Sequence, residues 1–227
     1  MVEREGLPAP AGAPDRPAAM PVLEEAGRQL RAPWAASIAG LLFSVLFTAA
    51  LLLVRSQADT DMQGTAMVVG GLYLAPFAGI MFLWFVAVIR DQIGEREDRF
   101  FATVFFGSGL LFVGLLFTTA AVVSTPVTIV RFLGGEQLSA EGASLLRALG
   151  YTLLFTMATR AAAVFMLATA TIGIRSGVFP RWFAVLGYLL ALVLLVAVSI
   201  IDWFILVLPA WVAVVSLFIL RRERARR

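Results

Sequence analysis

The sequence predicts an all-α polytopic membrane protein with six transmembrane helices and both termini in the cytoplasm. Three observations support this fold class. The chain of 227 residues is 60% hydrophobic and 15% charged, with a mean hydropathy of +0.91, whereas a soluble domain is about 45–50% apolar and about 25% charged. The apolar residues form runs of about 20, the length that crosses hydrocarbon as a helix. The arginines flank these runs unequally.

The apolar runs divide the chain into a transmembrane domain and two tails. Helices are expected in the runs because a helix satisfies its own backbone polar groups in lipid, whereas barrel strands alternate over about 10 residues. Residues 1–32, rich in Pro, Ala and charge, predict a disordered cytoplasmic tail. Residues 33–220 form the six-helix domain, and 221–227 form a basic cytoplasmic tail. The predicted spans are 33–54, 66–89, 100–123, 149–174, 182–201 and 203–220.

Orientation follows from the arginines beside the spans. One set of helix ends carries only Arg55, Arg131 and Arg147, and the other set carries twelve arginines. The positive-inside rule places the richer set in the cytoplasm, where it contacts anionic lipid headgroups. This arrangement explains the pI of about 10.1 without a nucleic-acid partner. All 18 basic residues are Arg, a bias typical of GC-rich genomes, which favours a bacterial plasma membrane.

Missing residue types exclude many chemistries. The chain has no His and no Cys, which excludes imidazole-ligated haem, HExxH zinc sites, Ser–His proteolysis and thiol chemistry. It has no Lys for a Schiff base or a Walker P-loop. The sequence therefore predicts a protein that is not an enzyme and that holds no metal or cofactor.

Two local features refine the predicted helices. Pro76 and Pro209 lie inside the second and sixth runs and predict kinks. The longest external segment spans residues 124–148, where Ser139 predicts the cap of a helix that starts at Ala140, with Glu141 in its first turn. The fourth helix would then project beyond the membrane, with residues 125–133 before it along the interface.

A polar stripe on the fourth span is the main candidate functional site. Thr152, Thr156 and Arg160 are spaced i, i+4 and i+8, which places them on one face of an α-helix. Arg160 lies near the middle of the apolar run 149–174, where an arginine costs about 2.5–3.5 kcal/mol on insertion scales. It therefore needs partners or water. The stripe predicts either a buried polar lane or the wall of a hydrated cavity.

The sequence leaves two candidate partners for the Arg160 side chain. Asp202, in the turn between the last two spans, is the first candidate. Backbone carbonyls freed by Pro76, with Tyr73 nearby, are the second. Three roles follow: an arginine that clamps the bundle, a site for a small anionic ligand or lipid headgroup, or a side chain that snorkels to the interface.

Residues 177–188 have the sequence GVFPRWFAVLGY, which is similar to a segment of a known group of membrane proteins. The segment resembles one in uncharacterised multi-helix integral membrane proteins of actinobacteria, in which a small-residue turn, Pro-Arg-Trp and an apolar helix recur in this order. The similarity covers residues 160–200 well and the remainder only as a hydropathy pattern. It implies a six-helix integral membrane protein and transfers no catalytic residue.

Two functional hypotheses follow. The first is transport or small-molecule handling through a polar site around Arg160, Thr156, Thr152 and Asp202. The alternative is a structural or regulatory component that packs with other membrane proteins through small residues, since glycines permit close helix approach. The glycines predicted to pack are Gly70, Gly71 and Gly79 in the second span and Gly107, Gly109 and Gly114 in the third.

Overall fold

The protein is largely helical in the residues that its computed structural model describes, which are 33–55, 64–93, 99–177, 179–196 and 202–224. No strand occurs in these ranges, which confirms the all-α prediction. The predicted tails at 1–32 and 225–227 lie outside them. The elements are α2 (Pro33–Arg55), α3 (Gly64–Ile93), α4 (Arg99–Phe132), α5 (Ala140–Tyr151), the π-helix η2 (Thr152–Ala158), α6 (Thr159–Arg175), α7 (Arg181–Val196), the 3₁₀ turn η3 (Asp202–Leu206) and α8 (Val207–Arg224).

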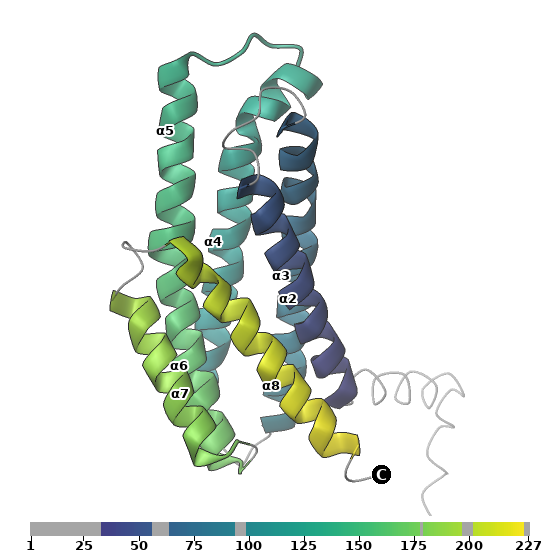
Figure 1. Ribbon diagram of the computed structural model, residues 1–227, viewed down its shortest axis with the longest axis vertical. Helices are drawn as coiled ribbons and strands as arrows, with labels where there is room; N and C mark the ends of the chain where they lie inside the picture. The colour runs from purple at the N-terminus through teal and green to yellow at the C-terminus, as the bar shows by residue number, and fades with distance from the viewer. Residues whose placement is uncertain (1–32, 56–63, 94–98, 178, 197–201, 225–227) are drawn as a thin grey trace, which may run out of the picture. The chain divides into compact units, whose positions relative to one another are not determined.

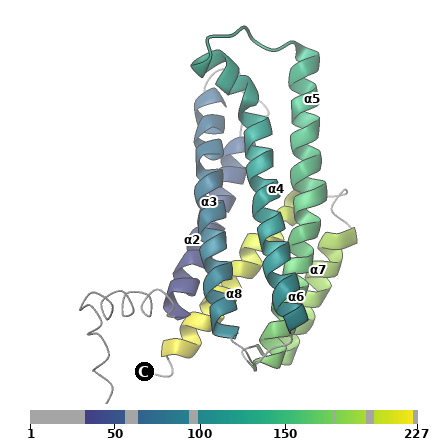
Figure 2. The same cartoon turned by 180° about the vertical axis from the view of Figure 1, so that it is seen from behind.

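Successive passes run in alternating directions (Figures 1 and 2). Helices α2, α4 and α7 run one way, while α3, the continuous α5–η2–α6 helix and α8 run the other way. Helix α2 packs against α3 and α8, α3 against α4, α4 against α6, and α6 against α7. We call the end of the bundle where α2 finishes and α5 begins the Arg55 end. Helix α2 begins and α8 finishes at the opposite end (Figure 1).

Five of these helices are long and apolar enough to cross a membrane, consistent with a polytopic integral membrane protein. The candidate spans are Trp34–Arg55, Val69–Arg90, Phe100–Phe132, Ala140–Arg175 and Trp203–Arg221. Helix α7 is a shorter apolar helix, and the last part of its predicted run, 197–201, lies outside the described residues. Exposed Trp34 and Trp182 at one end and Trp203 towards the other match the aromatic belts of membrane interfaces.

The hairpin of α4 and α5 extends beyond the other helices at the Arg55 end (Figure 1). Helix α4 has 34 residues, or about 50 Å, against about 30 Å of hydrocarbon. The predicted cap is confirmed, because the Ser139 hydroxyl accepts a hydrogen bond from the Gly142 amide at 3.2 Å. Residues 125–132 continue α4 instead of forming a separate segment along the interface. This last part of α4 leans away from the preceding turns around Pro126, which cannot donate to the turn before it.

A phenylalanine cluster forms the core between α2, α3, α4 and α6. Phe82 is fully buried, and its ring centroid lies 4.7 Å from Phe43, 5.1 Å from Phe112 and 4.9 Å from Phe165. Phe105 stacks on Phe165 at 4.9 Å. Such offset and edge-on ring pairs contribute about 0.5–1.5 kcal/mol each beyond the area they bury.

Within this chain, three of the glycines predicted to pack lie against a neighbouring helix and three do not. A Cβ at Gly71 would lie 2.9 Å from the Ala50 carbonyl of α2, and a Cβ at Gly79 would overlap the ring of Phe117. Gly109 also faces a neighbour, with Val86 3.2 Å from its Cβ position. Three other glycines face open space within this chain, with nothing within 4 Å of the Cβ position: Gly70, Gly107 and Gly114. Hydropathy alone does not reveal which helix face meets a neighbour.

The GVFPRWFAVLGY segment is a turn followed by a packing face. Gly177 has φ +64°, a conformation that favours glycine, and the Phe179 amide bonds back to the Gly173 carbonyl at 2.9 Å. Phe183 then stacks on Trp211 of α8, with centroids 4.4 Å apart and planes 6° apart. Aromatic rings therefore fill the space between α7 and α8.

Candidate functional site

The predicted polar stripe lies on a segment that is not an α-helix. Residues Thr152–Ala158 form a π-helix, in which the Thr159 amide bonds to the Leu154 carbonyl five residues earlier. An i→i+5 hydrogen bond widens the turn beyond the 3.6 residues of an α-helix. That Thr152, Thr156 and Arg160 share one face stays a prediction in this changed geometry. Single π turns occur frequently at functional sites.

Arg160 begins the return to α-helical geometry. Its side chain is half-buried, and Nη1 donates a hydrogen bond to the Thr156 carbonyl at 2.6 Å. Within the described residues, the guanidinium of Arg160 makes this one hydrogen bond. Thr152 is exposed, and its hydroxyl donates to the Ala148 carbonyl at 2.9 Å, the local bond that Thr commonly makes in helices. Arg160 therefore stabilises a backbone carbonyl where the hydrogen-bond pattern changes.

The predicted pairing of Arg160 with Asp202 is not described by the structure. Asp202 begins η3, but its side chain lies outside the described residues. Tyr73, the other predicted neighbour, is exposed on α3 at 60%.

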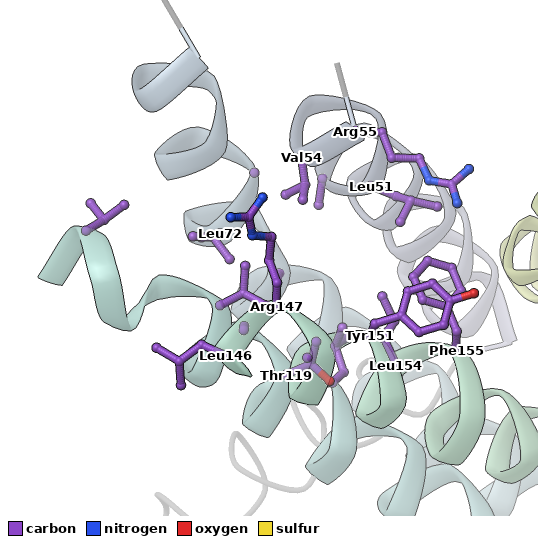
Figure 3. Close-up of a pocket in the computed structure, with 18 of the residues that line it drawn as sticks. Leu51, Val54, Arg55, Leu72, Thr119, Leu146, Arg147, Tyr151, Leu154 and Phe155 are labelled. Carbon is purple, nitrogen blue, oxygen red and sulfur yellow. The ribbon is translucent and has the colours of Figure 1, made fainter. Parts of the chain in front are cut away.

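A pocket of about 670 Å³ lies instead towards the Arg55 end, between α2, α3, α4, α5 and η2 (Figure 3). Its volume falls within the range of about 300–1,000 Å³ that is typical of small-molecule sites. Most lining side chains are aliphatic or aromatic, including Phe47 and Leu51 of α2, Leu116 of α4 and Leu154 of η2. Of the predicted site residues, Arg160, Thr156 and Thr152 do not line it, and the side chain of Asp202 lies outside the described residues.

The π-helix supplies part of the pocket wall. Leu154 and Phe155 of η2 line the pocket, as does Tyr151 directly before it. Tyr151 and Phe155 pack together with ring centroids 4.6 Å apart. The departure from α-helical geometry therefore occurs where this helix borders the pocket, and it turns apolar side chains towards the space.

Arg55, the last residue of α2, is a fixed cation of the pocket wall. Its guanidinium carbon lies 5.5 Å from the Phe155 ring centroid and 4.6 Å from that of Trp203. Cation–π contacts of this kind contribute about 0.5–2 kcal/mol each, depending on desolvation. Its position at the helix C-terminus is also favourable for a cation. Three elements, α2, η2 and η3, thus hold Arg55 at the pocket.

Arg147 of α5 is the second cation. It lines the pocket, and Figure 3 shows its side chain extending towards Leu72 of α3. Within the described residues it makes no hydrogen bond or ion pair. The described lining of the pocket contains no acidic residue. The charged part of the described lining is therefore positive, with Thr119 and Tyr151 as its hydroxyl groups.

The arrangement is suited to binding and offers no metal site. The described residues contain no group of three or more His, Cys, Asp or Glu that could hold a metal ion. Sequence reasoning missed this pocket, because Arg55 and Arg147 entered it only as markers of orientation. The one available signal was that Arg55 and Arg147 are two of the three arginines at the arginine-poor set of helix ends.

Replacing Arg160 by leucine is expected to leave the protein folded, to lower the free energy of unfolding by no more than about 1.5 kcal/mol and to raise it by up to about 3 kcal/mol. The change removes one hydrogen bond, of about 0.5–1.5 kcal/mol, and also removes the cost of a charge in hydrocarbon, about 2.5–3.5 kcal/mol on insertion scales. The apparent Tm of the purified protein measures the effect. Arg160→Lys retains the charge without the planar fork and should be less stable than Arg160→Leu.

A larger loss of stability in Arg160→Leu would contradict a purely local role for this arginine. If the loss arises because Asp202 is left unpaired, Asp202→Asn should restore part of it, since removing one partner of an ion pair leaves the other uncompensated.

No protein-family model matches the chain, and no curated protein or solved structure shows significant similarity to it.

Proposed function

We propose that this integral membrane protein handles a small hydrophobic molecule, which it binds in the pocket at the Arg55 end. The observation that carries the proposal is the pocket itself, about 670 Å³ with largely apolar walls contributed by five helical segments. A space of this size exceeds by far the roughly 30 Å³ of one water. An apolar space of this size is suited to a hydrocarbon ligand.

The pocket supports this function better than the predicted site around Arg160 does. The Arg160 guanidinium is engaged with its own helix at Thr156, and neither residue lines the pocket. The role of the π-helix is then to shape the wall through Leu154 and Phe155. The proposed function is non-enzymatic, because the sequence has no His, Cys or Lys.

Two neighbouring alanines of α4 provide a matched test. Ala120 lines the pocket, whereas Ala121 is exposed and does not. In protein reconstituted into phosphatidylcholine nanodiscs, saturable binding of tritiated dodecan-1-ol should be lost in Ala120→Phe, because the phenyl ring fills the space. Ala121→Phe should bind like the unaltered protein. Equal binding by both variants, or no saturable binding by the unaltered protein, would contradict the proposed function.

We further infer that the arginine-rich end lies in the cytoplasm of a bacterium, which gives the topology predicted from the sequence and puts the pocket on the outer side of the plasma membrane. The uneven arginines support this orientation. The likeness of residues 177–188 to actinobacterial membrane proteins supports the bacterial source. Reporter fusions after positions 60 and 135 should report the outside, and those after 95, 178 and 227 the cytoplasm. An external signal at 95 or 178 would contradict this orientation.

The alternative, a structural or regulatory component that packs with other membrane proteins, has one observation in its favour. Gly107 and Gly114 are exposed on α4 about two turns apart, with open space at both Cβ positions. Small residues on a lipid-facing surface permit close helix approach. If this alternative holds, Gly114→Leu should lower self-association or partner association in membranes, as measured by energy transfer between labelled chains. Unchanged association in Gly114→Leu would contradict this alternative.

A further inference from the structure

We propose that the ligand of the pocket is an anionic amphiphile, with an alkyl chain among the apolar walls and a carboxylate or phosphate head held by Arg147. This inference rests on the proposed function and adds the chemical class of the ligand. The two arginines and the absence of any carboxylate in the described lining make the pocket complementary to a negative head group.

The charged and apolar parts of the pocket are separated along the bundle axis. On α2, Arg55 lies at the helix end and Phe47 lies eight residues earlier, which is about 12 Å deeper at 1.5 Å per residue. On the opposite wall, Phe155 lies eight residues beyond Arg147, and its ring lies 5.5 Å from the Arg55 guanidinium carbon. The two cations therefore lie towards the Arg55 end of the pocket, and the apolar wall of α2 continues past them to Phe47. A ligand with a charged head and a hydrocarbon tail matches this gradient.

The two cations differ in how they are held. Arg55 lies against Phe155 and Trp203, so its charge has a set position. Arg147 is exposed and extends from α5 across the pocket wall (Figure 3). A guanidinium that faces an apolar pocket can bind a carboxylate or phosphate through two parallel hydrogen bonds. Arg147 is therefore the residue whose charge the ligand head would neutralise, and Arg55 supplies the surrounding positive potential.

Head-group selectivity in the intact protein tests the inference. In phosphatidylcholine nanodiscs, dodecanoate or dodecyl phosphate should compete with tritiated dodecan-1-ol at a concentration about tenfold or more below that of unlabelled dodecan-1-ol, because charge-assisted hydrogen bonds are the stronger kind. The tighter of the two anions identifies the head as a fatty-acid carboxylate or a phosphate monoester. Inorganic phosphate alone should not compete, since it lacks the tail.

Variants at the cations separate this inference from the proposed function. Arg147→Gln should remove the preference for the anionic probes, so that dodecanoate, dodecyl phosphate and unlabelled dodecan-1-ol compete at similar concentrations, whereas Arg147→Lys, which retains a point charge, should be intermediate. Arg131→Gln is the control, because Arg131 is an exposed arginine of the same end that does not line the pocket. If Arg147→Gln binds dodecanoate and dodecyl phosphate as the unaltered protein does, or if dodecan-1-ol competes equally well, the anionic assignment is overturned while the pocket remains a hydrophobic site. Loss of all binding in Arg131→Gln would overturn it as well.

Discussion

Replacing Phe82 by alanine is expected to lower the free energy of unfolding by about 3 kcal/mol, at the lower end of the range for a buried Phe→Ala change. Phe82 is fully buried on α3, and its ring contacts rings from three other helices, those of Phe43, Phe112 and Phe165. Between membrane helices the loss is mainly one of packing, since lipid tails are as apolar as the core. Unfolding in a mixed-micelle denaturation series measures the change.

Phe77 is the matched control for this prediction. It lies on the same helix, but 57% of its surface is exposed, so Phe77→Ala should change stability by less than about 0.5 kcal/mol, as surface substitutions usually do. Equal effects of the two substitutions would contradict the inward orientation of Phe82 and the four-helix core built around it.

Replacing Gly173 by alanine is the second large effect. A Cβ at Gly173 would overlap the ring of Phe179, which is itself held by Phe183 at 5.0 Å and by Phe218 at 6.1 Å. Overpacking of this kind costs about 1–3 kcal/mol. The higher helix propensity of alanine offsets only about 0.8–1 kcal/mol of this loss. We expect a lower Tm and weaker packing of α7 on α6.

Gly107→Ala is the matched control, and its expected effect on stability has the opposite sign. Nothing lies within 4 Å of the Cβ position at Gly107, so the substitution should be neutral or stabilising by up to about 1 kcal/mol through helix propensity alone. If Gly173→Ala stabilised the protein as Gly107→Ala does, the turn from α6 into α7 would differ from the one described.

Much of the helical framework could be predicted from the sequence. Apolar run length located the passes, because lipid requires each segment to satisfy its own backbone. Side-chain capping placed the start of α5 at Ala140 after Ser139, since that signal is local. The end of α4 was predicted near position 123, nine residues before Phe132. Hydropathy cannot locate an end that lies beyond the hydrocarbon.

The site could not be predicted from the sequence for two physical reasons. The π-helix at Thr152–Ala158 depends on backbone hydrogen bonds between residues five apart instead of four apart. No residue type in TLLFTMA marks that change. The surroundings of Thr152, Thr156 and Arg160 were therefore predicted with α-helical geometry throughout. The pocket is formed by α2, α3, α4 and the continuous α5–η2 helix, and neither spacing nor composition reveals which of their faces leave a space.

The most direct test of the central claim, that the pocket at the Arg55 end holds an anionic amphiphile, is native mass spectrometry of the protein released from mild detergent. The account predicts one copurified anionic lipid or fatty acid on the unaltered protein and on Ala121→Phe, and none on Ala120→Phe, because Ala120 lines the pocket and Ala121 does not. The same copurified mass at the same occupancy on all three proteins would contradict it.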